Sequence, residues 1–114
     1  MCGRIAQYRS KQQYAHEMGW DEYARSLTFS GPSERYNVPP GSSPYLLHAL
    51  DGKEHIDAVH WGYHTAWAKE KKIPMAVNAT IEKARSPYWR ALWKTGRAIV
   101  PADGWYEWTG EKGN

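Results

Sequence analysis

Two strand-like runs flank Asp51-Gly52 in the middle of the chain. They cover residues 45–50 and 54–61, and each mixes apolar with polar side chains. An Asp-Gly pair between two such runs is a strong hairpin signal, because both turn positions need positive φ angles. The pattern therefore predicts a β-hairpin over residues 45–61.

The N-terminal part of the pattern predicts a strand followed by a helix. Residues 5–8 have strand character, and Ser10 is followed three positions later by Gln13. That spacing is typical of a capping box, in which the first side chain caps the helix and the second reaches back to it. We expect a helix from Ser10 to about Met18, ended by Gly19.

A second helix is expected after Ser86-Pro87, which supply an N-cap and a first-turn proline. Aromatic and apolar residues then recur at the four-residue spacing that places side chains on one helix face. These pairs are Tyr88 with Leu92 and Trp89 with Trp93. The helix is predicted to run to about Lys94 and to end at Gly96.

Shorter signals complete the prediction. Residues 75–78, 99–100 and 105–108 look like short strands, and residues 28–44 look like a long irregular loop rich in Ser, Gly and Pro. Residues 110–114 resemble a hairpin turn with no returning strand. Without alternating βαβ units, the pattern favours one α+β domain over residues 1–114, with a mainly antiparallel, barrel-like sheet and flanking helices.

Composition narrows the class of protein. Hydrophobic residues make up 41% of the 114 residues and charged residues 24%, values that exclude a wholly disordered chain. No apolar run has the length of a membrane span and no N-terminal signal segment is visible, so we expect a cytoplasmic protein with no membrane partner. The net charge of +3 is compatible with a nucleic-acid partner.

Cys2 is the only cysteine, and its position decides its chemistry. Once Met1 is removed, one residue presents both a thiol and an α-amine, groups whose ordinary pKa values are about 8.5 and about 7.7–8.0. Such a 1,2-aminothiol condenses with an aldehyde to a Schiff base, which the thiolate closes to a thiazolidine ring. Position alone favours a small residue without function, but the neighbouring Gly3 and Arg4 suit close backbone approach and phosphate binding.

Two further residues are candidates for the same chemistry. Glu107 lies between Tyr106 and Trp108, where a carboxylate is costly to bury unless it is paired or used, and a buried carboxylate suits general acid–base work. A glutamate on the solvent face of an edge strand is an equal alternative. Asn78 ends its predicted strand, where it could polarise a reacting group or simply terminate the strand. His60 and His64 lie in strand and loop context, so we expect no metal site.

Taken together, several motifs resemble the SOS-response-associated peptidase (SRAP) family. The two most specific are the first and the last, and the pieces follow the family order over nearly the whole chain. They are Met1-Cys2-Gly3-Arg4, Arg35-Tyr36-Asn37-Val38-Pro39-Pro40-Gly41, Trp61-Gly62, Asn78-Ala79 with Glu82, and Arg97 leading into Val100-Pro101-Ala102-Asp103-Gly104-Trp105-Tyr106-Glu107-Trp108.

The resemblance implies a DNA-damage enzyme without a cofactor. It implies covalent capture of abasic sites in single-stranded DNA through a thiazolidine at Cys2, with autoproteolytic removal of Met1 by Cys2 and Glu107. By the same resemblance Asn78 positions the reacting sugar and Glu107 handles protons. Arg4, Asn37, Trp61 and Gly62 belong to the DNA-binding surface. The partner is then single-stranded DNA with abasic sites, bound by a monomer that in a bacterium would be associated with the nucleoid.

The chain departs from the family pattern at three places. Family members usually carry an arginine where this chain has Thr80, and a proline after the Trp-Gly motif where this chain has the His64-Thr65 region. Their pattern also continues to a His-x-Arg-Met-Pro motif that none of the five histidines here matches. Either the chain is the N-terminal portion of an SRAP-like domain, as we expect, or its site lacks one member. Two other functions stay open: a noncatalytic single-strand-binding module whose Trp and Tyr rings stack bases, and, ranked last, a cysteine hydrolase acting on other proteins.

Overall fold

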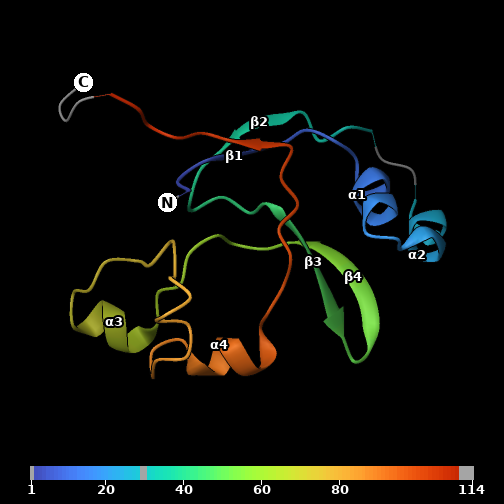
Figure 1. Ribbon diagram of the computed structural model, residues 1–114. Coiled ribbons are helices and arrows are strands. Elements are labelled where there is room, and N and C mark those ends of the chain that lie inside the picture. The colour runs from blue at the N-terminus through green and yellow to red at the C-terminus, as the bar shows by residue number, and fades with distance from the viewer. Residues whose placement is uncertain (1, 29–30, 111–114) are drawn as a thin grey trace.

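The fold is described from a computed structural model, which covers residues 2–28 and 31–110. Short helices and antiparallel strands alternate along the chain without βαβ units (Figure 1). The elements in chain order are β1 (Ile5–Gln7), α1 (Lys11–Glu17), α2 (Asp21–Ser26), β2 (Arg35–Val38), β3 (Tyr45–Leu50), β4 (Lys53–Ala58), α3 (Ala66–Glu70), α4 (Arg90–Thr95) and β5 (Gly104–Trp105).

The first sheet has three strands in the order β2-β1-β5, with both pairs antiparallel. All three residues of β1 are buried, as expected for the central strand. The expectation of an irregular loop over residues 28–44 was therefore wrong at residues 35–38, because β2 pairs Val38 with Ile5 and Arg35 with Gln7. This sheet brings the N-terminal residues next to segments far away in the sequence.

The second sheet is the predicted hairpin. Strands β3 and β4 pair in register from Tyr45 opposite Ala58 to Leu50 opposite Lys53. Asp51 and Gly52 have φ angles of 52° and 74°, so both turn positions adopt the positive values that the Asp-Gly pair was expected to supply. The hairpin prediction is confirmed, although β4 ends at Ala58, three residues earlier than expected.

Helix α1 begins as the sequence predicts. The Ser10 side chain accepts a hydrogen bond from the Gln13 backbone N–H, and the Gln13 side chain accepts one from the Ser10 N–H, which completes the capping box. The helix packs its buried face, Tyr14 and Ala15, on the hairpin. The resulting core cluster consists of Tyr14, Ala15, Leu47 and Ile56, with Trp20 and Tyr23 against its edge.

The two sheets are joined by a buried glutamine and one bridge. Gln7 is completely buried, and its amide nitrogen donates to the carbonyls of Tyr45 and Pro101 at 2.8 Å each. Its side-chain oxygen accepts from the Tyr45 N–H at 2.9 Å. Farther along β3, Leu47 and Ile99 exchange two backbone hydrogen bonds. These contacts fix the segment after α4 that contains Ile99 and Pro101, here called the returning segment, against both β1 and β3.

Several predicted elements are shorter than expected. Residues 75–78 contribute only an isolated bridge between Ala76 and Tyr63, and residues 105–108 contribute only Trp105 to β5. Helix α4 begins at Arg90 after a series of turns, not directly after the predicted proline. Helices α2 and α3 were not predicted.

The two sheets do not close into a barrel within the described residues, so the barrel-like part of the fold prediction is not confirmed. The mixture of helices with antiparallel sheets agrees with the predicted α+β class. The radius of gyration, 16.1 Å, exceeds the value of about 13 Å typical of a compact domain of ~100 residues. No helix in residues 2–28 and 31–110 combines the length and the apolar character needed to cross a membrane.

Candidate functional site

The backbone of Cys2 is tied to Asn78, which lies 76 residues away in the sequence. The Asn78 side-chain nitrogen Nδ2 donates to the carbonyl oxygen of Cys2 at 3.1 Å. The Cys2 thiol is half-buried and lies 3.5 Å from the Arg4 carbonyl oxygen. The structure therefore brings together two of the three residues that the sequence predicted to be catalytic.

A second contact holds Arg4 beside the strand β2. The Arg4 guanidinium donates from Nη1 to the Asn37 side-chain oxygen at 3.2 Å. An arginine has five N–H donors, so this bond leaves four for other partners. Tyr106 makes two further hydrogen bonds to the same backbone region. Its N–H donates to the Arg4 carbonyl at 3.0 Å, and its hydroxyl donates to the Tyr36 carbonyl at 2.6 Å. Arg4 and Asn37, both predicted to bind DNA, thus form one polar group.

Glu107 lies near this polar group and is exposed. A hollow of about 280 Å³ is lined by Gly3, Arg4, Tyr106, Glu107 and Trp108. Within the described residues, Glu107 has no hydrogen bond or ion pair with Cys2 or Asn78. The structure therefore agrees with the alternative of a glutamate that faces solvent, and Glu107 lines the same hollow as Gly3 and Arg4.

Trp61 and Gly62 line a larger apolar cavity that also reaches Asn78. This cavity has a volume of about 570 Å³, within the range of small-molecule and nucleotide pockets. The Trp61 indole N–H donates to the Val77 carbonyl at 2.9 Å, which fixes the ring beside the segment that ends in Asn78. Gly62 has a φ angle of 145°, and a Cβ atom there would overlap the Met75 sulfur.

The junction of β1, α1 and β5 is held by a buried carboxylate that the sequence analysis did not single out. The Asp103 side chain is 4% exposed; it accepts from the Tyr14 hydroxyl at 2.5 Å and the Tyr8 N–H at 2.8 Å, and pairs with Arg9 at 3.2 Å. Burial of the hydroxyl is the largest cause that raises the pKa of Tyr14 well above its usual range, and the hydrogen bond to Asp103 is the second. This network positions the segment that leads into Glu107.

The sequence signal for this network was present but weak. Asp103 lies in the Pro-Ala-Asp-Gly break between two expected strands, where an aspartate is an ordinary turn residue. Gln7 gave a clearer signal, because it is a polar residue next to Ile5 and Ala6 in a run with strand character. Neither position reveals its partners, which lie 38 to 95 residues away in the sequence.

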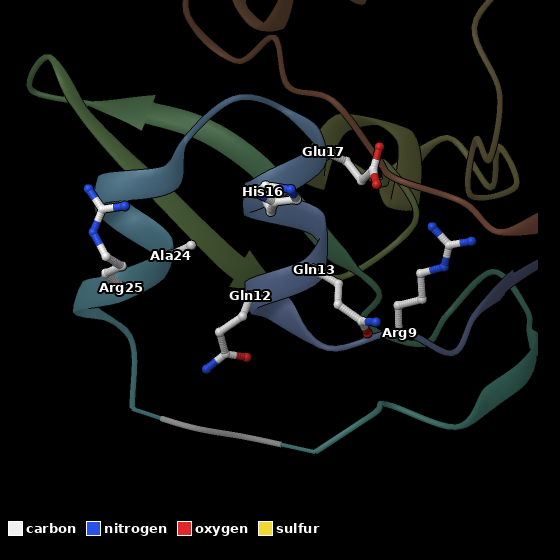
Figure 2. A pocket seen from close by; sticks show the side chains of 7 residues that line it. All are labelled: Arg9, Gln12, Gln13, His16, Glu17, Ala24 and Arg25. Atoms are coloured by element: carbon white, nitrogen blue, oxygen red, sulfur yellow. The ribbon is translucent and has the colours of Figure 1, made fainter.

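Another hollow lies between α1 and α2 and contains none of the predicted site residues. Figure 2 shows the side chains that line it, which are polar or charged except for one alanine: Arg9, Gln12, Gln13, His16, Glu17, Ala24 and Arg25. Its volume is about 460 Å³. No group of three or more metal-ligating side chains occurs in residues 2–28 and 31–110. His64 is bonded instead to the Ile73 carbonyl.

Comparison with known proteins identifies the relatives of this chain. The family model described as "SOS response associated peptidase (SRAP)" matches residues 1–114. The abasic site processing protein YedK of Escherichia coli (strain K12) is 39% identical over 113 residues, which cover 97% of this chain and 49% of that protein. The abasic site processing protein YoaM of Bacillus subtilis (strain 168) is 29% identical over 95% of this chain and 47% of its own length.

A solved structure shares the fold of this chain. The crystal structure of a phage-related protein from Bordetella bronchiseptica superimposes with a TM-score of 0.78 and 34% sequence identity, over 99% of this chain and 50% of that one. The chain spans about half the length of the relatives it matches. Because the family model matches residues 1–114 and YedK is 39% identical, the chain belongs to the SOS response associated peptidase (SRAP) family.

Proposed function

We propose that this protein captures abasic sites in single-stranded DNA as a covalent thiazolidine adduct at Cys2. The observation that carries the proposal is the hydrogen bond from Asn78 to the Cys2 carbonyl at 3.1 Å. It links the N-terminal residue to a side chain that borders a cavity of about 570 Å³. Its relatives YedK and YoaM are named abasic site processing proteins, which agrees with this chemistry.

The reaction begins with removal of Met1. Hydrolysis of the Met1–Cys2 peptide bond consumes one water and leaves the Cys2 α-amine free. The amine attacks the aldehyde carbon of the ring-opened abasic sugar, and loss of the carbonyl oxygen as water gives a Schiff base. The Cys2 thiolate then adds to the imine carbon and the nitrogen takes up a proton. Capture thus forms one C–N and one C–S bond and releases one water.

Asn78 and Glu107 support these steps in different ways. Within the described residues Asn78 makes one side-chain hydrogen bond, which leaves a second N–H and the amide oxygen to orient the sugar. Glu107 faces the hollow beside Gly3 and Arg4, where its carboxylate can accept the amine proton and return it to the departing water. The same carboxylate can activate the water that removes Met1.

The DNA backbone and the base next to the lesion contact the residues around this centre. Arg4 retains four N–H donors for a phosphate, and Asn37 holds its guanidinium in place. The Trp61 ring is fixed by its bond to Val77 and borders the cavity together with Gly62. Aromatic rings in such a position stack on unpaired bases, which favours single-stranded over paired DNA.

A denaturing-gel experiment tests the proposal. The wild-type chain is incubated with a single-stranded oligonucleotide that carries one abasic site, heated, and separated by electrophoresis. We expect a heat-stable adduct that is absent with an undamaged oligonucleotide. Cys2→Ala is expected to give none, and so is wild-type protein alkylated beforehand, since Cys2 is its only thiol. An adduct of equal yield from Cys2→Ala contradicts the proposal.

The second candidate is a noncatalytic single-strand-binding module. It is favoured by the exposure of Trp67, Trp105 and Trp108, which are 54%, 67% and 76% exposed. This function predicts reversible binding that weakens with salt and does not depend on the lesion. The same gel separates the two functions, because a reversible complex does not survive heating in denaturant.

A further inference from the structure

Two arginine side chains contact one tryptophan ring at the α4 end of the molecule. The guanidinium carbons of Arg85 and Arg97 lie 5.0 Å and 5.3 Å from the centroid of the Trp93 ring. Trp93 is on α4, Arg85 precedes this helix and Arg97 follows it. Guanidinium groups stack on indole rings through cation–π attraction, so the one ring holds both charges in the same small region.

This pair of charges is not neutralised by the protein. Within the described residues, neither Arg85 nor Arg97 forms an ion pair with a carboxylate. Their positions around one ring limit their separation to roughly 10 Å, about one Debye length at ~0.1 M salt, so the two charges repel each other. Two unpaired cations held together in this way form a site for a polyanion.

The surrounding segment concentrates the positive charge of the whole chain. Residues 80–97 contain five basic residues and one acidic residue, an excess of four positive charges, whereas the complete chain has a net charge of +3. The remainder of the protein is therefore close to neutral or slightly acidic. The charged residues of this segment are Glu82, Lys83, Arg85, Arg90, Lys94 and Arg97.

One arginine of the pair, Arg97, lines a hollow that adjoins the cavity bordered by Asn78. A hollow of about 240 Å³ beside α4 is lined by Trp93 and Arg97, among others. It shares Ala79, Trp89, Leu92 and Gly96 with the larger cavity bordered by Asn78 and Trp61. An extended strand whose sugar enters the larger cavity can therefore continue across the shared wall toward Arg97.

We propose that Arg85 and Arg97 bind backbone phosphates of the DNA strand whose abasic sugar is captured at Cys2. This clamp, defined as Arg85, Trp93 and Arg97, rests on the proposed function. Arginine binds phosphate oxygens through two parallel N–H bonds, and phosphate contacts position a strand without reading its sequence. The clamp is expected to fix the register of the strand at the α4 end of the molecule.

The salt dependence of DNA binding tests the clamp. The affinity of the 114-residue chain for an undamaged single-stranded oligonucleotide is measured by fluorescence anisotropy over a series of salt concentrations. Each phosphate contact contributes about 0.7 to the slope of log K against log salt concentration for a single strand. The double variant Arg85→Gln, Arg97→Gln is expected to lower that slope by about 1.4.

Two matched variants provide the controls. Arg85→Lys with Arg97→Lys keeps both charges and is expected to keep the slope, which separates the loss of charge from a loss of folding. Arg25→Gln with Lys53→Gln removes two exposed charges from α2 and from the start of β4, outside residues 80–97, and is expected to leave the slope unchanged. Circular dichroism checks that each variant is folded.

The outcomes distinguish the clamp from the proposed function. If wild type forms the heat-stable adduct but the Gln double variant keeps the wild-type slope, the clamp is wrong and the capture reaction stands. If the slope falls as expected and no adduct forms on an abasic oligonucleotide, the capture reaction is wrong and the phosphate contacts stand. Absence of any binding to single-stranded DNA by wild type overturns both.

Discussion

Replacement of Gln7 by leucine is expected to loosen the junction between the two sheets. Gln7 is completely buried and its amide makes three hydrogen bonds, to the N–H and carbonyl of Tyr45 and to the carbonyl of Pro101. Leucine has a similar size but no polar atom. Three backbone groups of β3 and the returning segment would then lose their partners in a buried position.

The cost follows from those three groups. A buried polar group without a partner costs about 1–3 kcal/mol, so even the lower end gives roughly 3 kcal/mol for Gln7→Leu. Part of this is offset because leucine is the more apolar side chain, by about 1 kcal/mol. We expect a net loss of at least about 2 kcal/mol, a large share of the 5–15 kcal/mol that stabilises a typical domain.

Urea unfolding followed by tryptophan fluorescence measures this loss. With a urea m-value of about 1–2 kcal/mol/M, typical of small proteins, a loss of ~2 kcal/mol moves the midpoint down by about 1–2 M. Gln12→Leu is the matched control, because Gln12 lies in α1 and donates to the Thr28 carbonyl at the surface. A Gln7→Leu midpoint within error of the Gln12→Leu midpoint would refute the reasoning.

Three further outcomes are expected. Burial first, and then the hydrogen bond to Asp103, raise the pKa of Tyr14 above its unfolded value of 10.0. The contribution of Tyr14 to the free energy of unfolding is therefore complete below about pH 10 and is lost as the pH rises further. Tyr14→Phe should flatten this loss in urea titrations at alkaline pH. Gly62→Ala should cost about 1–3 kcal/mol in thermal unfolding because of the positive φ and the overlap with Met75, while Gly31→Ala, in open space, should cost much less. Asn78→Ala should slow adduct formation about tenfold in a gel time course, with the unfolding free energy changed by no more than about 1 kcal/mol; an unchanged rate would contradict its role.

The elements that the sequence predicted well depend on local chemistry. The capping box of Ser10 and Gln13 satisfies backbone N–H groups within one turn, so its pattern is legible without knowledge of the rest of the chain. The turn at Asp51-Gly52 is local in the same sense, because its positive φ angles select these residue types. Both predictions needed only a few consecutive residues.

The elements that were missed depend on partners distant in the sequence. Residues 35–38 are flanked by Pro, Gly and Ser, which indicate a loop, yet they form β2 because the buried strand β1 offers unpaired backbone groups about 30 residues away. Residues 75–78 have the composition of a strand but meet only Tyr63, so one bridge forms. In both cases the available partner overrides local preference.

The candidate site shows the same division. The chemistry of Cys2 could be inferred from its position and type, but its contact with Asn78 spans 76 residues and became visible only in the fold. The hollow that Glu107 shares with Gly3 and Arg4 arises because β5 pairs with β1, and Cys2 and Arg4 lie just before β1. The arginine pair on Trp93 gave no sequence signal, since its members lie on either side of the helix that carries the ring.

The mass of the intact protein–DNA adduct tests the central proposal most directly. After incubation with a single-stranded oligonucleotide that carries one abasic site, the account predicts one species. Its mass equals the chain without Met1 plus the oligonucleotide, minus one water. Treatment with a borohydride reductant leaves that mass unchanged, because a closed thiazolidine has no imine to take up two hydrogens. A covalent species that retains Met1, or the complete absence of a covalent species from protein whose Met1 has been removed, would contradict it.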